Sequence, residues 1–177
     1  MSYFKKDLIW NKPKKTKKPV DKTWSSFSKY IRLRDCLKTT GTNTILKCCS
    51  CPRICNLKNS DAWHFISRTY LIHKYNLINV NGQCITCNRF QQGQWTAYFD
   101  FLVSFFWRFQ VDNLIETKNQ LCFEKERDHL YWNSLRKLLE KKFINWELGR
   151  NQLEVRATMV QLIKTNNLES FLKENIK

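Results

Sequence analysis

Residues 79–88 read Asn-Val-Asn-Gly-Gln-Cys-Ile-Thr-Cys-Asn, and this stretch contains the spacing that organises the chain, two cysteines separated by two residues. The pair is Cys84 and Cys87, and an equivalent pair, Cys48 and Cys51, lies upstream. A short Cys-x2-Cys turn presents both sulfur atoms to the same side, so two such turns can supply four thiolates to one tetrahedral zinc ion. We therefore predict a structural zinc site, because four thiolates leave no coordination position open for a substrate.

The remaining cysteines qualify this prediction. Cys49 and Cys55 lie beside the first pair and are rival ligands there, whereas Cys36 and Cys122 have no partner at metal spacing and are expected to be buried free thiols. The chain shows no N-terminal apolar run of secretory length and no apolar stretch long enough to span a bilayer. In a reducing compartment its eight cysteines would not form a disulfide scaffold, which favours metal ligands.

The segment between the two cysteine pairs carries polar residues of chemical interest. Residues 61–68 read Asp-Ala-Trp-His-Phe-Ile-Ser-Arg, and alternation through positions 63, 65 and 67 predicts a strand. Residues 81–82, Asn-Gly, predict a turn. A strand, a loop, a second short strand and a helix opened by Asn88 would bring His64 close to Asn88.

The oxygen-bearing residues near His64 predict a second metal. Asp61 precedes His64 by three residues, and Asn88 directly follows the cysteine Cys87. Carboxylate and amide oxygens are hard ligands that suit magnesium rather than zinc. We therefore expect a catalytic magnesium ion at Asp61 and Asn88, separate from the zinc.

Apolar periodicity predicts helices over most of the remaining chain. One stripe at helical spacing comprises Tyr98, Phe101, Leu102, Phe105, Phe106 and Phe109. It predicts a long helix over about 87–110 whose aromatic face is core. Further helices are predicted at 24–38, 131–143, 153–163 and 168–175, and the first of them should carry Lys29, Arg32 and Arg34 on its outer face.

The chain is strongly basic, with 31 Lys and Arg against 15 Asp and Glu and a formal charge of +16. Residues 1–23 hold many lysines and two prolines without apolar periodicity, which predicts a flexible basic arm that either contacts phosphates or only aids solubility. Cations also outnumber acidic residues between 24 and 100, so the arm does not account for all of the charge. The charge indicates a polyanionic partner.

These motifs resemble a known family. The order of His, Asn and Asn between cysteine pairs resembles the HNH, or ββα-metal, nucleases, and residues 27–98 resemble the NinG (Rap) recombination proteins of lambda-like phages. The matching segments are 28–35 (Ser-Lys-Tyr-Ile-Arg-Leu-Arg-Asp), 62–68 and 79–88, together with Gly93 and Tyr98. The Asp-x-x-His and Cys-x-x-Cys-Asn elements are also similar to phage recombination endonuclease VII, which resolves branched DNA.

The resemblance implies roles for the polar residues. His64 would be the general base, Asp61 and Asn88 the magnesium ligands, and Asn79 the residue that braces the loop. Two positions depart from the NinG pattern: Trp63 stands where Gly is usual, and Asp61 stands where many relatives have His. The tryptophan could crowd the site or wedge into distorted DNA.

The sequence thus predicts an α+β protein in three parts: a flexible basic arm at 1–23, a zinc-bound ββα-metal (HNH-like) nuclease domain at 24–110, and a helical C-terminal region at 111–177. The expected function is magnesium-dependent, structure-selective cleavage of branched DNA such as Holliday junctions, in the cytoplasm of a bacterial host cell. A homodimer would match the two-fold symmetry of a junction. The alternatives are a zinc-stabilised module that binds branched DNA without cleaving it, and an interaction protein whose aromatic helices dock a partner.

Overall fold

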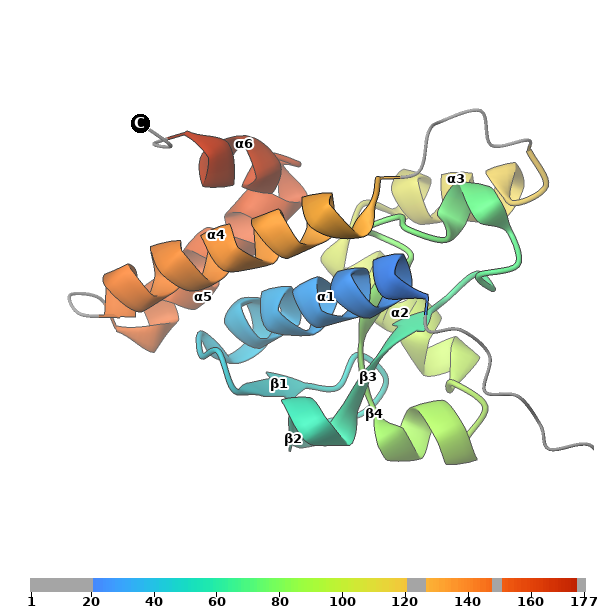
Figure 1. The fold of residues 1–177 in the computed structure, drawn as a ribbon. Coiled ribbons are helices and arrows are strands. Elements are labelled where there is room, and N and C mark those ends of the chain that lie inside the picture. The colour runs from blue at the N-terminus through green and yellow to red at the C-terminus, as the bar shows by residue number, and fades with distance from the viewer. Residues whose placement is uncertain (1–20, 121–126, 148–150, 175–177) are drawn as a thin grey trace, which may run out of the picture.

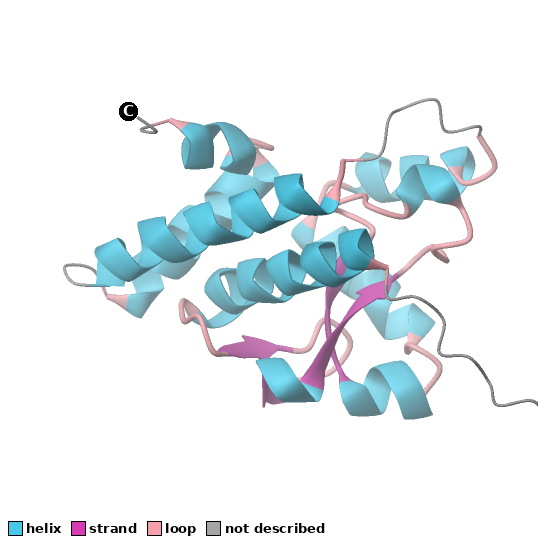
Figure 2. Cartoon of the chain, viewed as in Figure 1, coloured by secondary structure: helices cyan, strands magenta, loops and turns pink. Residues whose placement is uncertain are grey.

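We analysed a computed structural model of the chain, which describes residues 21–120, 127–147 and 151–174. The architecture is mixed α+β, as predicted, and combines six α-helices of the described residues with two two-stranded antiparallel sheets (Figures 1 and 2). The elements are α1 Lys22–Thr40, β1 Ile45–Lys47, β2 Ile54–Asn56, β3 Ser60–His64, β4 Val80–Cys84, α2 Trp95–Phe105, α3 Arg108–Thr117, α4 His129–Glu147, α5 Gln152–Lys164 and α6 Leu168–Lys173. Three short helical turns join them: Leu57–Asn59, Leu71–His73 and a π-helical turn, Thr86–Phe90. No helix within the described ranges has the length and apolar character needed to cross a bilayer.

Helix α1 packs both against the strands and against the C-terminal helices. Asp21 caps its N-terminus, because the Asp21 carboxylate accepts the Trp24 amide at 3.0 Å. The helix ends at Thr40, since the next residue, Gly41, has a left-handed φ of 73° that is incompatible with an α-helix. The predicted helix at 24–38 is confirmed, but the expectation that Arg34 lies on its outer face is wrong. Arg34 is buried because it follows Tyr30 by one helical turn and so falls on the apolar face of α1.

The C-terminal helices pack on α1 to form the helical core. Figure 1 shows α4 lying along α1, and α5 also contacts α1. Trp132 of α4 is almost fully buried, with its ring 4.6 Å from that of Phe27 and 5.5 Å from that of Tyr30. Val155 and Met159 of α5 complete the same apolar cluster. The helices predicted near 131–143, 153–163 and 168–175 are thereby confirmed as α4, α5 and α6.

Two hairpins carry the cysteine pairs. The first pair lies in the turn between β1 and β2, and the second pair begins at the last residue of β4. Strands β3 and β4 pair from Ser60 opposite Cys84 to His64 opposite Val80. The turn predicted at residues 81–82 is wrong, because both residues lie within β4. Gly82 is required there for close packing: its amide donates to the Asp35 carboxylate at 2.6 Å, and an added Cβ would lie 3.1 Å from Leu46.

The long helix predicted over 87–110 is broken in two places. The turn Thr86–Phe90 ends at a loop in which Gln92, Gly93 and Gln94 all have positive φ, and a second break at 106–107 separates α2 from α3. A Cβ on Gly93 would lie 2.5 Å from the Trp63 indole nitrogen, so this loop is shaped by contact with β3. The stripe is core only in part: Tyr98, Leu102 and Phe106 are buried, Phe101 and Phe105 half-buried, and Phe109 exposed.

Candidate metal centre and histidine pocket

The two cysteine pairs converge on one point. The sulfur atoms of Cys48, Cys51, Cys84 and Cys87 all lie within 4.8 Å of one another, and those of Cys51 and Cys84 are 3.9 Å apart. Antiparallel pairing of β3 with β4 delivers the second pair, and the β1–β2 turn delivers the first. Four sulfur atoms at these separations could hold one tetrahedral metal ion, so the predicted four-cysteine site is present in the fold.

Backbone amides are arranged to stabilise thiolates in this cluster. The Cys48 sulfur accepts the amides of Ser50 at 3.4 Å and Cys84 at 3.3 Å, and the Cys84 sulfur accepts the Cys87 amide at 3.5 Å. A hydrogen bond from the Cys49 thiol, together with these amides, lowers the pKa of Cys48 to about 4. Cys48 is therefore disposed to the anionic form that a metal requires, whereas burial raises the pKa of Cys51 and Cys87 in the absence of a metal.

The rival cysteines do not belong to the cluster. Cys49 is buried, and its sulfur lies 3.6 Å from the Ser50 hydroxyl. Cys55 and Cys36 are also buried beside the centre, and burial raises the pKa of Cys55 to about 11 and that of Cys36 to about 12. The three are neutral thiols at pH 7. The prediction of a buried free thiol is confirmed for Cys36, whereas Cys122 lies outside the described residues.

A buried charged network joins this centre to α1. The Asp35 carboxylate pairs with Arg34 and Lys38, each at 2.8 Å, and all three side chains are buried. Arg34 and Lys38 also donate to the Asn81 amide oxygen at 3.1 and 3.0 Å, which connects the helix to β4. Burial favours neutral Asp35, but the two cations outweigh that effect and lower its pKa. The sequence held one signal for this network. Counted from Phe27 at helical spacing, charged residues fall on the apolar face of α1.

Gln83 connects the two cysteine turns. Its side chain is fully buried, and its amide nitrogen donates to the Ser50 hydroxyl and to the Gly93 carbonyl, each at 2.6 Å. One contact holds the first cysteine turn and the other holds the loop that follows the second. The metal centre and the loop beside Trp63 are therefore positioned together.

Asp61 and Asn88 meet, as predicted, but in company with an unforeseen cation. The Asn88 amide donates to the Asp61 carboxylate at 2.7 Å. Arg89 donates to both carboxylate oxygens, at 2.9 and 3.0 Å, and its side chain is 58% exposed. Partial burial alone would raise the pKa of Asp61, but the hydrogen bonds from Arg89 and Asn88 lower it. The carboxylate is therefore ionised at neutral pH and already neutralised by a flexible surface arginine.

His64 lies on the other face of β3. It follows Asp61 by three residues, and an odd offset along a strand reverses the side-chain direction, with about 10 Å between the two positions. Its Nε2 hydrogen-bonds to the Lys74 carbonyl at 2.9 Å, and its ring stacks on Trp24 with centroids 4.8 Å apart. Burial lowers the pKa of His64 to about 4. Among the described residues, no hydrogen bond or ion pair joins His64 to Asp61 or Asn88, so the three do not converge as the sequence had suggested.

Asn79 spans the loop between β3 and β4. It is fully buried, its amide oxygen accepts the Ile66 amide at 2.7 Å, and its amide nitrogen donates to the carbonyls of Ile66 and His73, each at 2.9 Å. This loop includes Lys74, whose carbonyl holds His64. His73 is buried as well, and its Nε2 lies 3.2 Å from the Thr117 hydroxyl.

A cavity of about 340 Å³ opens beside His64. Its walls come from the end of β3 and from the loop after the second cysteine pair, and they include His64, Trp63, Arg68, Gly93 and Trp95. Trp63 is 38% exposed and Trp95 is 55% exposed, and no acidic side chain of the described residues lines the cavity. The combination of one histidine, one arginine and two accessible indole rings suits an anionic, aromatic ligand.

Comparisons with protein-family models, with curated proteins and with solved structures each return no match to this chain.

Proposed function

We propose that this chain is a zinc-containing, magnesium-dependent DNA endonuclease that cleaves branched DNA and uses His64 as its general base. The observation that carries the proposal is the anchored, neutral imidazole of His64 at the wall of a cavity without acidic residues. The resemblance of residues 27–98 to HNH-type nucleases points to the same chemistry.

The hydrogen bond of His64 determines which nitrogen could accept a proton. A carbonyl oxygen can only accept, so Nε2 must carry the hydrogen that it shares with Lys74. In the neutral ring Nδ1 is then the unprotonated nitrogen. A pKa near 4 keeps the ring neutral at pH 7. These features leave Nδ1 able to accept a proton from an attacking water, as a weak base whose pKa lies below the near-neutral value that suits this role best.

Zinc is the metal that best fits the four-cysteine centre. Tetrahedral sets of four thiolates are typical of structural zinc sites. Its proposed role is to hold the β3–β4 hairpin and the turn that bears Asn88 in register. No step of the reaction is assigned to this ion, because its four protein ligands leave no open position.

The second metal would take Asp61 and Asn88 as oxygen ligands. A magnesium ion there would supply positive charge to a DNA phosphate, at a position about 10 Å along β3 from His64 and on the other face of that strand. The residue types fit, but both carboxylate oxygens are engaged by Arg89, so binding requires that arginine to move. Its exposed guanidinium is free to exchange the carboxylate for a DNA phosphate.

DNA is the proposed substrate because the chain is strongly basic and because indole rings lie at the cavity. The formal charge of +16 favours a polyanion. Trp63 packs over Gly93 at the cavity wall and remains accessible, which supports the wedge interpretation of this residue over crowding. Unpaired or splayed bases at a branch could stack on Trp63 or Trp95.

Cleavage assays with matched variants test the proposal. Wild-type protein and the variant His64→Ala would be incubated with four-way junctions, flaps and plain duplex in magnesium. Wild type should cut branched DNA, and His64→Ala should cut at least about a hundredfold more slowly, the usual contribution of a general base. His129→Ala, on α4 and outside the cavity, is the control and should cut at the wild-type rate. Equal cutting by His64→Ala and wild type would refute the role of His64.

A second function is favoured by one specific contact. Arg89 neutralises Asp61, and Asp61 does not share a site with His64, so the fold also suits a module that binds branched DNA without cleaving it. In that case binding would be steeply salt-dependent, and substitution of Asp61 or His64 would change no activity. Loss of cleavage on either substitution would exclude this alternative.

A homodimer and a cytoplasmic location in a bacterial host remain parts of the proposal. Trp132 is buried in the helical core, whereas Trp107 and Phe109 are exposed and could contact a second copy. Light scattering of the purified protein with and without a four-way junction would measure the stoichiometry.

A further inference from the structure

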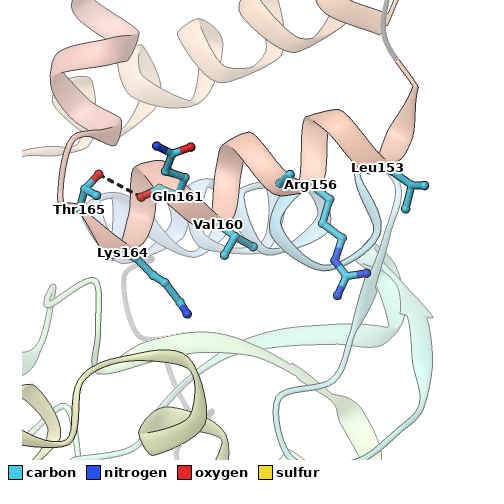
Figure 3. Close-up of a pocket in the computed structure, with 7 residues that line it drawn as sticks. Leu153, Arg156, Val160, Gln161, Lys164 and Thr165 are labelled. Atoms are coloured by element: carbon cyan, nitrogen blue, oxygen red, sulfur yellow. Dashed lines mark hydrogen bonds between the residues drawn. The ribbon is translucent and has the colours of Figure 1, made fainter.

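A basic groove runs between α5 and the first cysteine turn, away from the residues assigned to catalysis. It consists of a cavity of about 380 Å³ and an adjoining shallow surface along α5, which share Arg156 and Val160. Figure 3 shows Arg156, Val160 and Lys164 projecting from the same side of α5, as expected for residues four apart on a helix. The opposite wall is formed by α2 and by the turn that carries Cys48 and Cys51.

The groove is lined by cations alone among charged residues. Lys38, Lys47, Arg156 and Lys164 line the cavity or the adjoining surface of α5, and no aspartate or glutamate of the described ranges lines either one. Within the described part of the chain, Lys47, Arg156 and Lys164 form no ion pair. Burial lowers the pKa of Lys38 to about 8, which still leaves it charged at pH 7. The positive charge of Lys47, Arg156 and Lys164 is therefore concentrated here without local compensation, whereas that of Lys38 is balanced by Asp35.

The floor of the groove is aromatic. Phe101 and Phe105 lie nearly parallel, with ring centroids 5.8 Å apart. The Lys38 ammonium lies 4.8 Å from the Phe105 centroid, and the Lys164 ammonium lies 5.4 Å from the same centroid. Both rings are half-buried in the folded chain. A floor of rings beneath the unpaired Lys164 ammonium matches the sugar and phosphate of a nucleic-acid strand better than it matches an apolar protein helix.

We infer that this groove binds the phosphate backbone of a second segment of the DNA on which the chain acts. The occupant is a strand of nucleic acid, recognised by charge, with Arg156 and Lys164 as its phosphate contacts. The inference rests on the proposed function only in taking DNA as the polyanion. It assigns a purpose to α5, for which the sequence offered no motif.

Binding measurements on a surface variant test the groove. The double variant Arg156→Ala/Lys164→Ala would be compared with wild type by fluorescence anisotropy on a labelled four-way junction, without added magnesium so that cleavage does not contribute. Two lost phosphate contacts should weaken binding at least about tenfold near 100 mM salt and reduce the slope of log affinity against log salt by about 1.4 to 1.8. A second variant, Val160→Glu, places a carboxylate between the two cations and should weaken binding in the same direction.

A matched control separates local contact from overall charge. Lys137→Ala/Lys141→Ala removes the same charge from exposed positions of α4 and should change affinity less than about threefold.

If the α5 and α4 variants bind equally well, the groove inference is wrong, whatever the cleavage assay shows. If His64→Ala fails to cut while the α5 variant alone loses affinity, both proposals stand. If no protein cuts but the α5 variant still loses affinity, the nuclease proposal fails and the groove remains. Equal displacement of the junction by polyglutamate at the same charge concentration would show a general polyanion surface and overturn the assignment to DNA.

Discussion

The helical core and the metal region are held together by different forces. The helical core, formed by α1, α4, α5 and α6, buries large side chains such as Phe27 and Trp132 against one another. The metal region, formed by β1 to β4 and the cysteine turns, has a cluster in which Leu46 is the one fully buried aliphatic residue among cysteines. Short hairpins with so little apolar surface are marginal alone. The difference indicates that the core is stabilised by apolar burial and the metal region by its ligands and polar contacts.

Loss of the metal should reveal the difference between the two regions most clearly, because it should destabilise the metal region alone. Structural zinc contributes on the order of 10 kcal/mol to small metal domains, as much as the whole stability of a typical domain. In the variant Cys84→Ser, amide hydrogens of residues 45–90 should therefore lose exchange protection while those of α4 and α5 retain it. Hydrogen exchange with mass spectrometry and metal analysis would measure both. Cys49→Ser, a buried thiol outside the cluster, is the control and should keep one metal ion per chain; full protection in Cys84→Ser would refute the metal centre.

Truncation of a side chain in the helical core should destabilise the helices and leave the metal region intact. The loss of stability should be smaller than that caused by loss of the metal. Trp132→Ala should lower the free energy of unfolding by about 3 kcal/mol and leave the metal content unchanged. The expected loss is at the low end of the usual range because the Trp132 indole nitrogen has no hydrogen-bond partner among the described residues. Denaturant titration would measure it, with the exposed Leu130→Ala, expected within about 0.5 kcal/mol of wild type, as the control. Metal loss from Trp132→Ala would show that the regions do not behave separately.

The smallest expected effect concerns His64, which lies where α1 contacts β3. Its pKa is about 4 in the folded chain against 6.5 unfolded, so between these values the unfolded state binds the extra proton. The contribution of His64 to the free energy of unfolding should be fully present above pH 6.5. It should fall by about 2 kcal/mol from pH 7 to pH 5. His64→Gln should remove that part of the pH dependence. The measurement is the difference between the two proteins in denaturant titrations, because the cysteines titrate alike in both; parallel pH profiles would contradict the depressed pKa.

Spacing in the sequence was enough to predict the four-cysteine site, the α+β class and four of the helices, because ligand geometry and helical periodicity depend on residues close together in the chain. It failed where distant residues compete for one position. The helix predicted over 87–110 is broken at 92–94, where Gly93 meets Trp63, and again at 106–107. Arg34 was predicted on the surface because its charge was weighed without Asp35 and Asn81, which satisfy it inside the fold.

What the sequence by itself determined is which side chains are available: four thiols in two short turns, a histidine and an aspartate three apart, and an excess of positive charge. Only the tertiary structure decided how they combine. Pairing of β3 with β4 brings Asp61 to Asn88 and Arg89 and turns His64 to the opposite face, because successive side chains of a strand alternate. Packing of α5 on α1 brings Lys164 over the Phe105 ring of α2 and Arg156 to the cavity that this ring lines, a proximity that no local pattern contains.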